Sequence, residues 1–199
     1  MTQWKMEYRA FMDDDPTLVR QVLDHNATHD GLTKRVQDVT DTYIVGESDV
    51  TIRTRDGSLK AKGPVKSVDD TVYELQDNRP WFPLTRETVN DTLGIPTRKK
   101  GIFSKKESDP KSFATWDALI AYAKERGLTT ATVQKSSAKY EGAKLEVEVT
   151  KVTIDGAEGY TIAVMANDTA AIHDAMDRYC LKGHGTRMSY AGAIREAKR

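Results

Sequence analysis

Charged side chains recur at even spacings in several segments of this sequence that are otherwise typical of β-strands. The sets are Lys5, Glu7 and Arg9; Arg53 and Arg55; Lys60 and Lys62; Lys135 and Lys139; and Glu146 and Glu148. Successive side chains of a strand point to opposite faces, so each set lies on one face of its strand. The opposite face is often apolar, as in the first segment and the last. The chain must therefore fold into a sheet that keeps charge on one side of several strands and an apolar core on the other.

Two architectures accommodate strands of this kind. In a sandwich the charged faces are exposed to solvent, and the protein would then be an interaction module. In a barrel wide enough for water and ligand, the same faces line the interior. Basic side chains bind phosphate oxygens through charge-assisted hydrogen bonds, and carboxylates bind hard divalent cations, so the mixture of signs favours the barrel. We predict a β-barrel whose interior binds a polyphosphate, with the interaction module as the alternative.

Local patterns predict the order of the elements. Strands are predicted over residues 3–12, 32–45, the two arms of a hairpin at Asp56-Gly57, 71–76, 129–141, 144–154 and 159–166. Helices are predicted over residues 16–25, 113–126 and 170–179. The expected fold class is α+β: an antiparallel β-barrel with flanking helices, formed as a single domain of residues 1–199.

Residues 77–112 interrupt this regular pattern. The segment holds Pro80, Pro83, Pro96 and Pro110, and a basic cluster over residues 98–106. We expect an irregular insertion, part of it mobile, with one short strand or helix around residues 84–93. A basic cluster of this kind contacts RNA or DNA in some proteins, and in more of them it is a solvated loop.

The composition limits the classes of function. Lys plus Arg and Asp plus Glu are 30 each, so the net charge is +0 and no bulk field attracts nucleic acid or an acidic membrane. Any anion site must come from a local concentration of basic residues. The one cysteine, Cys180, excludes an internal disulfide, and we expect it to be a buried thiol. No apolar stretch reaches the roughly 18 to 20 residues that span a bilayer, which favours a cytoplasmic protein without a membrane role.

The order of these motifs resembles the CYTH or triphosphate tunnel metalloenzyme superfamily, which includes thiamine triphosphatases, class IV adenylate cyclases, inorganic triphosphatases and RNA triphosphatases. The matching segments are Lys5-x-Glu7-x-Arg9, Asp41-Thr42-Tyr43, the hairpin from Ile52 to Pro64, Val133 to Ser137, Leu145 to Val149, and Ser189-Tyr190. The resemblance runs along most of the chain and implies one CYTH-like domain. It also implies a triphosphate-containing ligand and metal-dependent hydrolysis of that ligand.

The sequence departs from the superfamily mainly on the metal-binding side. Lys5 stands in place of the first glutamate of the opening motif, and Ala163 and Met165 stand where a late Glu-x-Glu strand is expected. Ser137 replaces an arginine expected near Lys135. The basic half of the site is therefore better kept than the acidic half, and the chain is a divergent match.

These observations give a candidate site. The expected phosphate-binding residues are Arg9, Arg53, Arg55, Lys60, Lys62, Lys135 and Lys139. The expected ligands of Mg²⁺ or Mn²⁺ are Glu7, Glu146 and Glu148, of which Glu146 and Glu148 would also be catalytic. The expected partner is a nucleotide or another phosphorylated small molecule, or the 5′-triphosphate end of an RNA. The sequence leaves open whether the protein is an enzyme that hydrolyses this ligand or a barrel that only binds it.

Overall fold

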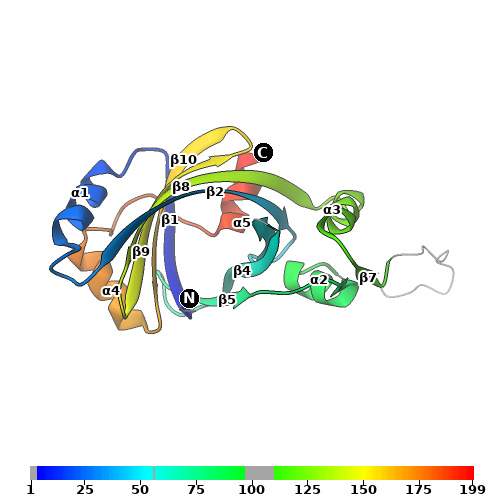
Figure 1. Cartoon of the computed structure of the whole chain (residues 1–199), viewed down its shortest axis with the longest axis horizontal. Coiled ribbons are helices and arrows are strands. Elements are labelled where there is room, and N and C mark those ends of the chain that lie inside the picture. Colours follow the sequence, from blue (N-terminus) through cyan, green and yellow to red (C-terminus); the bar gives the residue numbers. More distant parts are fainter. Residues whose placement is uncertain (1–3, 56, 97–109) are drawn as a thin grey trace.

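The computed structural model describes residues 4–55, 57–96 and 110–199, and its centre is a closed antiparallel β-barrel of eight strands (Figure 1). In spatial order the strands are β10 (Ala157–Ala166), β9 (Leu145–Ile154), β8 (Thr129–Glu141), β2 (Thr33–Val45), β3 (Thr51–Arg55), β4 (Ser58–Ser67), β5 (Tyr73–Asn78) and β1 (Met6–Met12). Pairing of β1 with β10 closes the ring. The predicted α+β barrel is confirmed, and the sandwich is wrong because the sheet closes on itself.

The number of paired residues differs between neighbouring strands of the barrel. β1 pairs with β10 from Met6 to Met12, but it pairs with β5 only at Met6 and Glu7. β3 pairs with β2 only at residues 42–45, so residues 33–40 pair with β8 on one side and with no described strand on the other. Most side chains of residues 33–40 are exposed.

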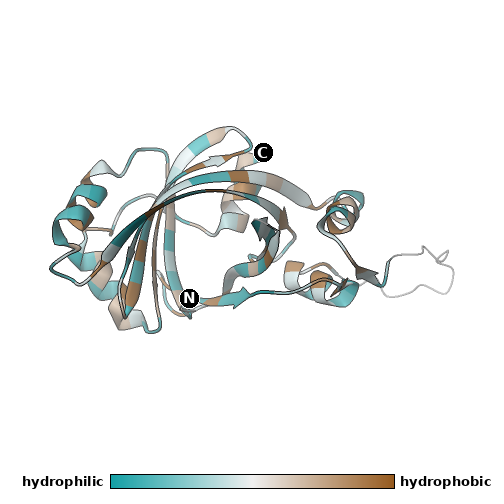
Figure 2. Cartoon of the chain, viewed as in Figure 1, coloured by the Kyte–Doolittle hydropathy of each residue, from teal (hydrophilic) through white to brown (hydrophobic). Residues whose placement is uncertain are grey.

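Two pairs of helices cover the outer face of the barrel. α1 (Thr17–Asn26) and α4 (Thr169–Arg178) pack on β1, β8, β9 and β10, and Figure 1 shows them together at one side. α2 (Arg86–Leu93) and α3 (Trp116–Glu125) pack on β2, β3 and β4 at the other side. Figure 2 shows hydrophilic and hydrophobic positions alternating along the strands, as expected when one strand face meets these helices.

The last helix, α5 (Tyr190–Ala197), packs on the other face of the sheet. Its apolar residues join a core cluster with Val45, Val133, Val152 and Ile154. Strand register puts these four side chains on the same face as Lys135, which is the inner face of the barrel. α5 therefore fills one end of the interior with apolar side chains. Ser189 caps it, its hydroxyl accepting a hydrogen bond from the Gly192 amide at 3.0 Å.

Most predicted elements are present with boundaries shifted by one to three residues. The region around residues 84–93 contains both alternatives: β6 (Leu84–Thr85), paired with β7 (Ser112–Phe113), and then α2. The helix predicted over 113–126 begins later, since Thr115 caps α3 by accepting a hydrogen bond from the Ala118 amide. The basic cluster of residues 98–106 lies outside the described residues. A short strand, β11 (Thr186–Arg187), pairs with β1.

The structure also bears on Cys180 and on the lack of a membrane-spanning stretch. Cys180 is exposed, so the expectation of a buried thiol is wrong; it follows the end of α4 in a left-handed conformation with φ of 55°. In the part of the chain that the structure describes, no helix combines the length and the apolar character needed to cross a membrane.

Candidate ligand-binding site in the barrel interior

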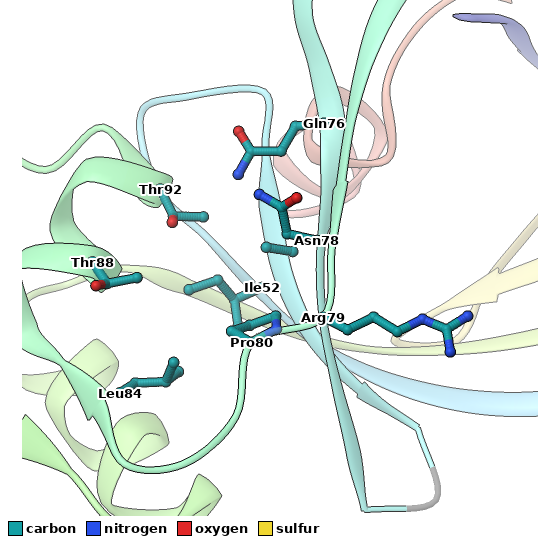
Figure 3. Close-up of a pocket in the computed structure, with 9 residues that line it drawn as sticks. Ile52, Gln76, Asn78, Arg79, Pro80, Leu84, Thr88 and Thr92 are labelled. Atoms are coloured by element: carbon teal, nitrogen blue, oxygen red, sulfur yellow. The ribbon is translucent and has the colours of Figure 1, made fainter. Parts of the chain in front are cut away.

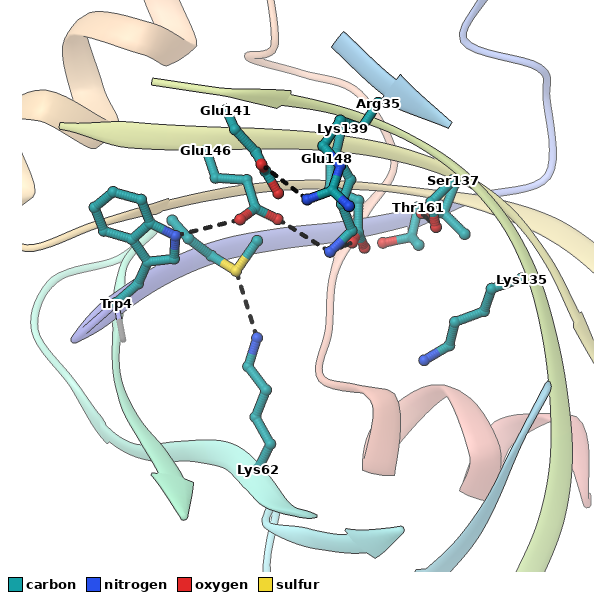
Figure 4. Close-up of polar contacts among 12 residues, drawn as sticks. Trp4, Arg35, Lys62, Lys135, Ser137, Lys139, Glu141, Glu146, Glu148 and Thr161 are labelled. Carbon is teal, nitrogen blue, oxygen red and sulfur yellow. Dashed lines mark hydrogen bonds and ion pairs between the residues drawn. The ribbon is translucent and has the colours of Figure 1, made fainter. Parts of the chain in front are cut away.

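Strand register places every predicted site residue on the inner face of the barrel. Directly opposed residues of paired strands point to the same side, so the face can be followed from strand to strand. For example, Glu7 is opposite Met165, which is opposite Glu146. Followed round the ring, the inner face contains Glu7, Arg9, Arg35, Asp41, Tyr43, Arg53, Arg55, Lys60, Lys62, Asp77, Lys135, Lys139, Glu141, Glu146 and Glu148. Figure 4 shows Lys62 and Lys135 extending into the interior from different walls.

The most tightly connected part of this face is the Asp41 cluster, defined as Asp41, Arg53, Arg55 and Lys135. Asp41 is fully buried, and its two oxygens accept hydrogen bonds from all three basic side chains. Arg55 donates from Nε at 2.6 Å and from Nη2 at 2.9 Å, and Lys135 donates from Nζ at 2.9 Å. The Lys135 ammonium also donates to the hydroxyl of Tyr43. One carboxylate thus holds three cations together.

The charge of the Asp41 cluster is unbalanced. Burial would raise the pKa of Asp41, but hydrogen bonding by Arg55 and the charges of Lys135 and Arg53 outweigh it and hold that pKa far below its ordinary value. Burial and the nearby Arg53 charge lower the pKa of Lys135 well below 10.5, although Asp41 acts in the opposite direction. The cluster holds three basic side chains against one carboxylate, so positive charge is in excess at this point of the interior.

A second group, the glutamate cluster, consists of Glu7, Glu146, Glu148, Arg9, Lys62 and Lys139. Glu7 accepts from Arg9 Nε at 3.0 Å and from Lys62 Nζ at 2.9 Å. Burial would raise the pKa of Glu7, but the charges of Arg9 and Lys62 lower it from 4.5 to about 2. This carboxylate is therefore ionised and neutralised by side chains of β1 and β4.

The other two glutamates of the cluster are also paired with basic side chains. Glu148 lies 3.6 Å from Arg9 Nη1 and 3.3 Å from Lys139 Nζ. Glu146 lies 3.3 Å from the same ammonium and accepts a hydrogen bond of 3.3 Å from the indole of Trp4, as Figure 4 shows. Burial would raise the pKa of Glu148, but Arg9 and Lys139 hold it far below its ordinary value.

Tyr190 of α5 forms the floor between the two clusters. Its ring stacks on Tyr43 with centroids 5.6 Å apart, and the Lys135 ammonium lies 4.1 Å from its ring centroid. The Arg9 guanidinium carbon is 4.8 Å from the same centroid. The Tyr190 hydroxyl is buried and has no hydrogen-bond partner among the residues that the structure describes. Burial raises its pKa well above 10, so it stays protonated and can donate.

Several basic side chains of the inner face remain partly accessible to solvent. The exposed fraction of the side chain is 27% for Arg55, 25% for Lys60 and 20% for Lys62. Lys60 pairs with Asp77 at 2.9 Å. Water and small anions can therefore reach these three basic groups. A depression of about 630 Å³ over β2, β8, β9 and β10 is lined mainly by outward-facing residues such as Gln134, Ser136 and Thr153, so it lies on the outer wall of the barrel.

The carboxylates do not fit a divalent metal ion. Each of Glu7, Glu146 and Glu148 is already bound by one or two basic side chains of the chain itself. Among the described residues, no three His, Cys, Asp or Glu side chains are grouped so that they could hold a metal ion. The predicted phosphate-binding residues are thus brought together, whereas the predicted metal ligands share the face without forming a metal site.

A separate cavity of about 320 Å³ lies outside the barrel, between its outer wall and α2 (Figure 3). Its lining is Ile52, Ala61, Gln76, Asn78, Arg79, Pro80, Leu84, Thr88 and Thr92. The Arg79 guanidinium points away from this space in Figure 3. None of the predicted site residues contributes to the lining, so this cavity does not belong to the charged interior.

The candidate site predicted from the sequence omits three contributors to the interior: Asp41 and Asp77 as partners of the basic residues, and Tyr190 as the floor. Asp41 and Tyr190 lie in segments that match the superfamily, but the predicted site gives them no role. Asp41 and Tyr43 are two positions apart on one strand, the same spacing that identified the other charged faces. Asp77 lies in the segment interpreted as irregular, which hid its place at the end of β5. Nothing in the local sequence indicates that Tyr190 enters the barrel.

Comparison with solved structures relates this arrangement to known proteins. The PH1012 protein of Pyrococcus horikoshii OT3 superposes with a TM-score of 0.53 at 13% identity, over 94% of this chain and 98% of that one. A Hippeastrum protein with a dominant triphosphatase activity gives 0.51 at 10% identity, over 97% and 96%. The triphosphatase of the mimivirus capping enzyme gives 0.51 at 6% identity, over 90% of both chains. The chain has the fold of the triphosphate tunnel proteins.

Comparison of structures relates the chain to these proteins, whereas comparison of whole sequences does not. No protein-family model matches the sequence, and no curated protein sequence matches it. At identities of 6% to 13% the likeness establishes the fold, and the resemblance stated from the motif order is confirmed at that level. What the tunnel binds has to be argued from its own side chains.

Proposed function

We propose that the barrel interior binds the phosphate chain of a triphosphate-containing ligand, which is a nucleotide, the 5′-triphosphate end of an RNA or another polyphosphate. One observation carries this proposal: the closed register turns the basic side chains of β1, β3, β4 and β8 towards one interior, where they outnumber the carboxylates. The basic residues of these strands are Arg9, Arg53, Arg55, Lys60, Lys62, Lys135 and Lys139, and Arg35 of β2 lies on the same face. The carboxylates of this face are Glu7, Asp41, Asp77, Glu141, Glu146 and Glu148.

The Asp41 cluster offers the geometry that a phosphate group requires. Arg55 binds both oxygens of Asp41 in a two-pronged manner, and Arg guanidinium groups bind phosphate oxygens in the same way. Three basic side chains share the one carboxylate of Asp41, so the cluster carries more positive charge than Asp41 balances. An entering phosphate supplies the missing negative charge and accepts from the same donors.

A chain of several phosphates suits the interior better than a single phosphate does. The basic residues lie in two groups, the Asp41 cluster and the glutamate cluster, with Tyr190 between them. A linear polyphosphate, with several charged groups along its length, can contact basic residues of both groups at once. The triphosphatase activities of the Hippeastrum and mimivirus proteins with this fold support a triphosphate as the ligand class.

The first test replaces Arg53 and Arg55 together with alanine. We expect at least about a tenfold loss of affinity for tripolyphosphate, measured by isothermal titration calorimetry, since two charge-assisted contacts are lost. The matched control replaces two exposed basic residues, Lys151 and Lys182, with alanine. An equal loss in both double variants would mean that binding depends on overall charge, and the proposal would fail.

Tyr190→Phe tests the floor of the same site. The variant removes a buried hydroxyl that has no partner in the described structure, so the melting temperature should stay the same or rise slightly. If the hydroxyl donates to a bound phosphate, affinity for tripolyphosphate should fall about fivefold to tenfold. Calorimetry and thermal unfolding of the one variant measure both quantities. Unchanged affinity would show that the hydroxyl does not contact the ligand.

Hydrolysis of the bound ligand is the second candidate, and the triphosphatase activities named for the Hippeastrum and mimivirus proteins favour it. Glu146 and Glu148 are the residues that would serve it, and Mg²⁺ or Mn²⁺ the cofactors. Their pairing with Lys139 speaks against that role. Phosphate release from nucleoside triphosphates, tripolyphosphate and triphosphate-ended RNA decides between the candidates: release that disappears in Glu146→Gln would establish an enzyme.

A further inference from the structure

We infer that the interior takes its polyphosphate as the metal-free anion, and that Glu7, Glu146 and Glu148 act as internal counter-ions that the ligand displaces. This inference rests on the proposed function, since it concerns the form in which the same ligand enters the same site. It reverses the role that the sequence predicted for these three residues.

Each of the three glutamates already contacts a basic side chain. Glu7 is bound by Arg9 and Lys62, each within hydrogen-bond distance. Lys139 lies 3.3 Å from both Glu146 and Glu148. A divalent cation among these groups would lie beside several fixed positive charges, and their repulsion opposes its binding.

β10 lies between the two strands that carry the glutamates and keeps Glu7 apart from the other two. Register aligns Glu146, Met165 and Glu7 across β9, β10 and β1. Adjacent strands lie about 4.8 Å apart, so Glu146 and Glu7 are separated by roughly 10 Å at their backbones. The Met165 sulfur between them lies 3.4 Å from Lys62 Nζ, so an apolar side chain and an ammonium group occupy the intervening space.

The inner face of β10 also lacks carboxylates of its own. Its inward positions next to the glutamates are Thr161, Ala163 and Met165. Thr161 already accepts a hydrogen bond of 3.3 Å from Arg9. The side chains of Ala163 and Met165 contain no oxygen that could bind a metal ion. Mg²⁺ requires oxygen ligands at about 2.1 Å in a near-octahedral arrangement, and this wall does not supply them.

Two consequences follow for binding. Mg²⁺ associates with free polyphosphate and reduces its negative charge, so Mg²⁺ should compete with the protein for the ligand. Each glutamate must also release its basic partners when the phosphates arrive. Neutralising one glutamate removes that competition and a repulsive charge, so the variant should bind the anion more tightly. A metal-dependent site predicts the opposite: Mg²⁺ should strengthen binding, and neutralising a glutamate should weaken it.

The test measures tripolyphosphate binding by calorimetry in EDTA and again in excess Mg²⁺. We expect affinity at least tenfold higher in EDTA. Glu148→Gln should bind about tenfold more tightly than the natural chain in EDTA, and Glu146→Gln serves as a second variant if Glu148→Gln does not fold. The control is Glu158→Gln, the same substitution at an exposed residue, whose affinity should not change.

The possible outcomes separate this inference from the proposed function. Binding that requires Mg²⁺, or that weakens in both glutamine variants, would overturn the inference and leave the proposed function standing. Binding of Mn²⁺ to the protein alone, followed by electron paramagnetic resonance and lost in Glu148→Gln, would overturn it as well. Absence of binding both in EDTA and in Mg²⁺ would refute the inference together with the proposed function.

Discussion

Asp41→Ala should destabilise the protein by about 3 to 5 kcal/mol, the largest effect expected from a single substitution in the interior. Asp41 is fully buried and accepts hydrogen bonds from Arg53, Arg55 and Lys135. Removing the carboxylate leaves three basic side chains close together with no charge to balance them. Their mutual repulsion then adds to the cost of burying Lys135. Urea unfolding followed by circular dichroism at pH 7 measures the loss.

The control for this substitution is Asp38→Ala, which removes the same group from an exposed position of the same strand. Its effect on the free energy of unfolding should stay within about 0.5 kcal/mol. Equal losses in the two variants would show that Asp41 does not hold the cluster together. The rest of the interior would then have to be explained without it.

Asp41→Ala also links stability to the proposed ligand. An anion that enters the interior can take the place of the missing carboxylate, so tripolyphosphate should raise the melting temperature of the variant more than that of the natural chain. Lys135 contributes to this difference, since a phosphate close to it favours its protonated form. Equal stabilisation of the two proteins would place the bound anion away from the Asp41 cluster.

The inner face could be predicted from the sequence because side chains two positions apart on a strand lie on the same face. Arg53 and Arg55, or Glu146 and Glu148, lie two positions apart, and that spacing fixes a shared face whatever the rest of the chain does. A sandwich and a barrel use the same spacing, however. Only the pairing of β1 with β10 decides between them, and residues so far apart along the chain leave no local sign of that contact.

The role of the glutamates was harder to predict for a related reason. A glutamate at the right strand position looks the same in a sequence whether it binds a metal ion or a lysine. The difference lies in Lys139, which reaches both Glu146 and Glu148 from the neighbouring strand, and in Lys62, which reaches Glu7 from β4, two strands away in the ring. These contacts depend on register and on barrel curvature. The motif order therefore predicts the fold and the charged face, but not which charges neutralise one another.

The pH range in which acid unfolds this protein should depend largely on the interior carboxylates. The variant Glu7→Gln measures the contribution of one of them. The folded pKa of Glu7 is about 2, against an ordinary value of 4.5, because the charges of Arg9 and Lys62 outweigh the effect of burial. A carboxylate with a lowered folded pKa stabilises the fold above its unfolded pKa, and this contribution is lost as the pH falls through the folded value. The shift corresponds to about 3 kcal/mol at pH 7.

The expected result is a difference in unfolding free energy between the natural chain and Glu7→Gln that depends on pH. The difference should be about 3 kcal/mol at pH 7, should shrink as the pH falls from 4.5 towards 2, and should be small at pH 2. Urea unfolding at a series of pH values measures it, with Glu74→Gln as the control because Glu74 is exposed on β5. A difference independent of pH would mean that glutamine costs stability by its shape, and that the pairs of Glu7 with Arg9 and Lys62 contribute little. The same pairs are the ones that an entering polyphosphate must break, so a small value would also make displacement of Glu7 by the ligand easy.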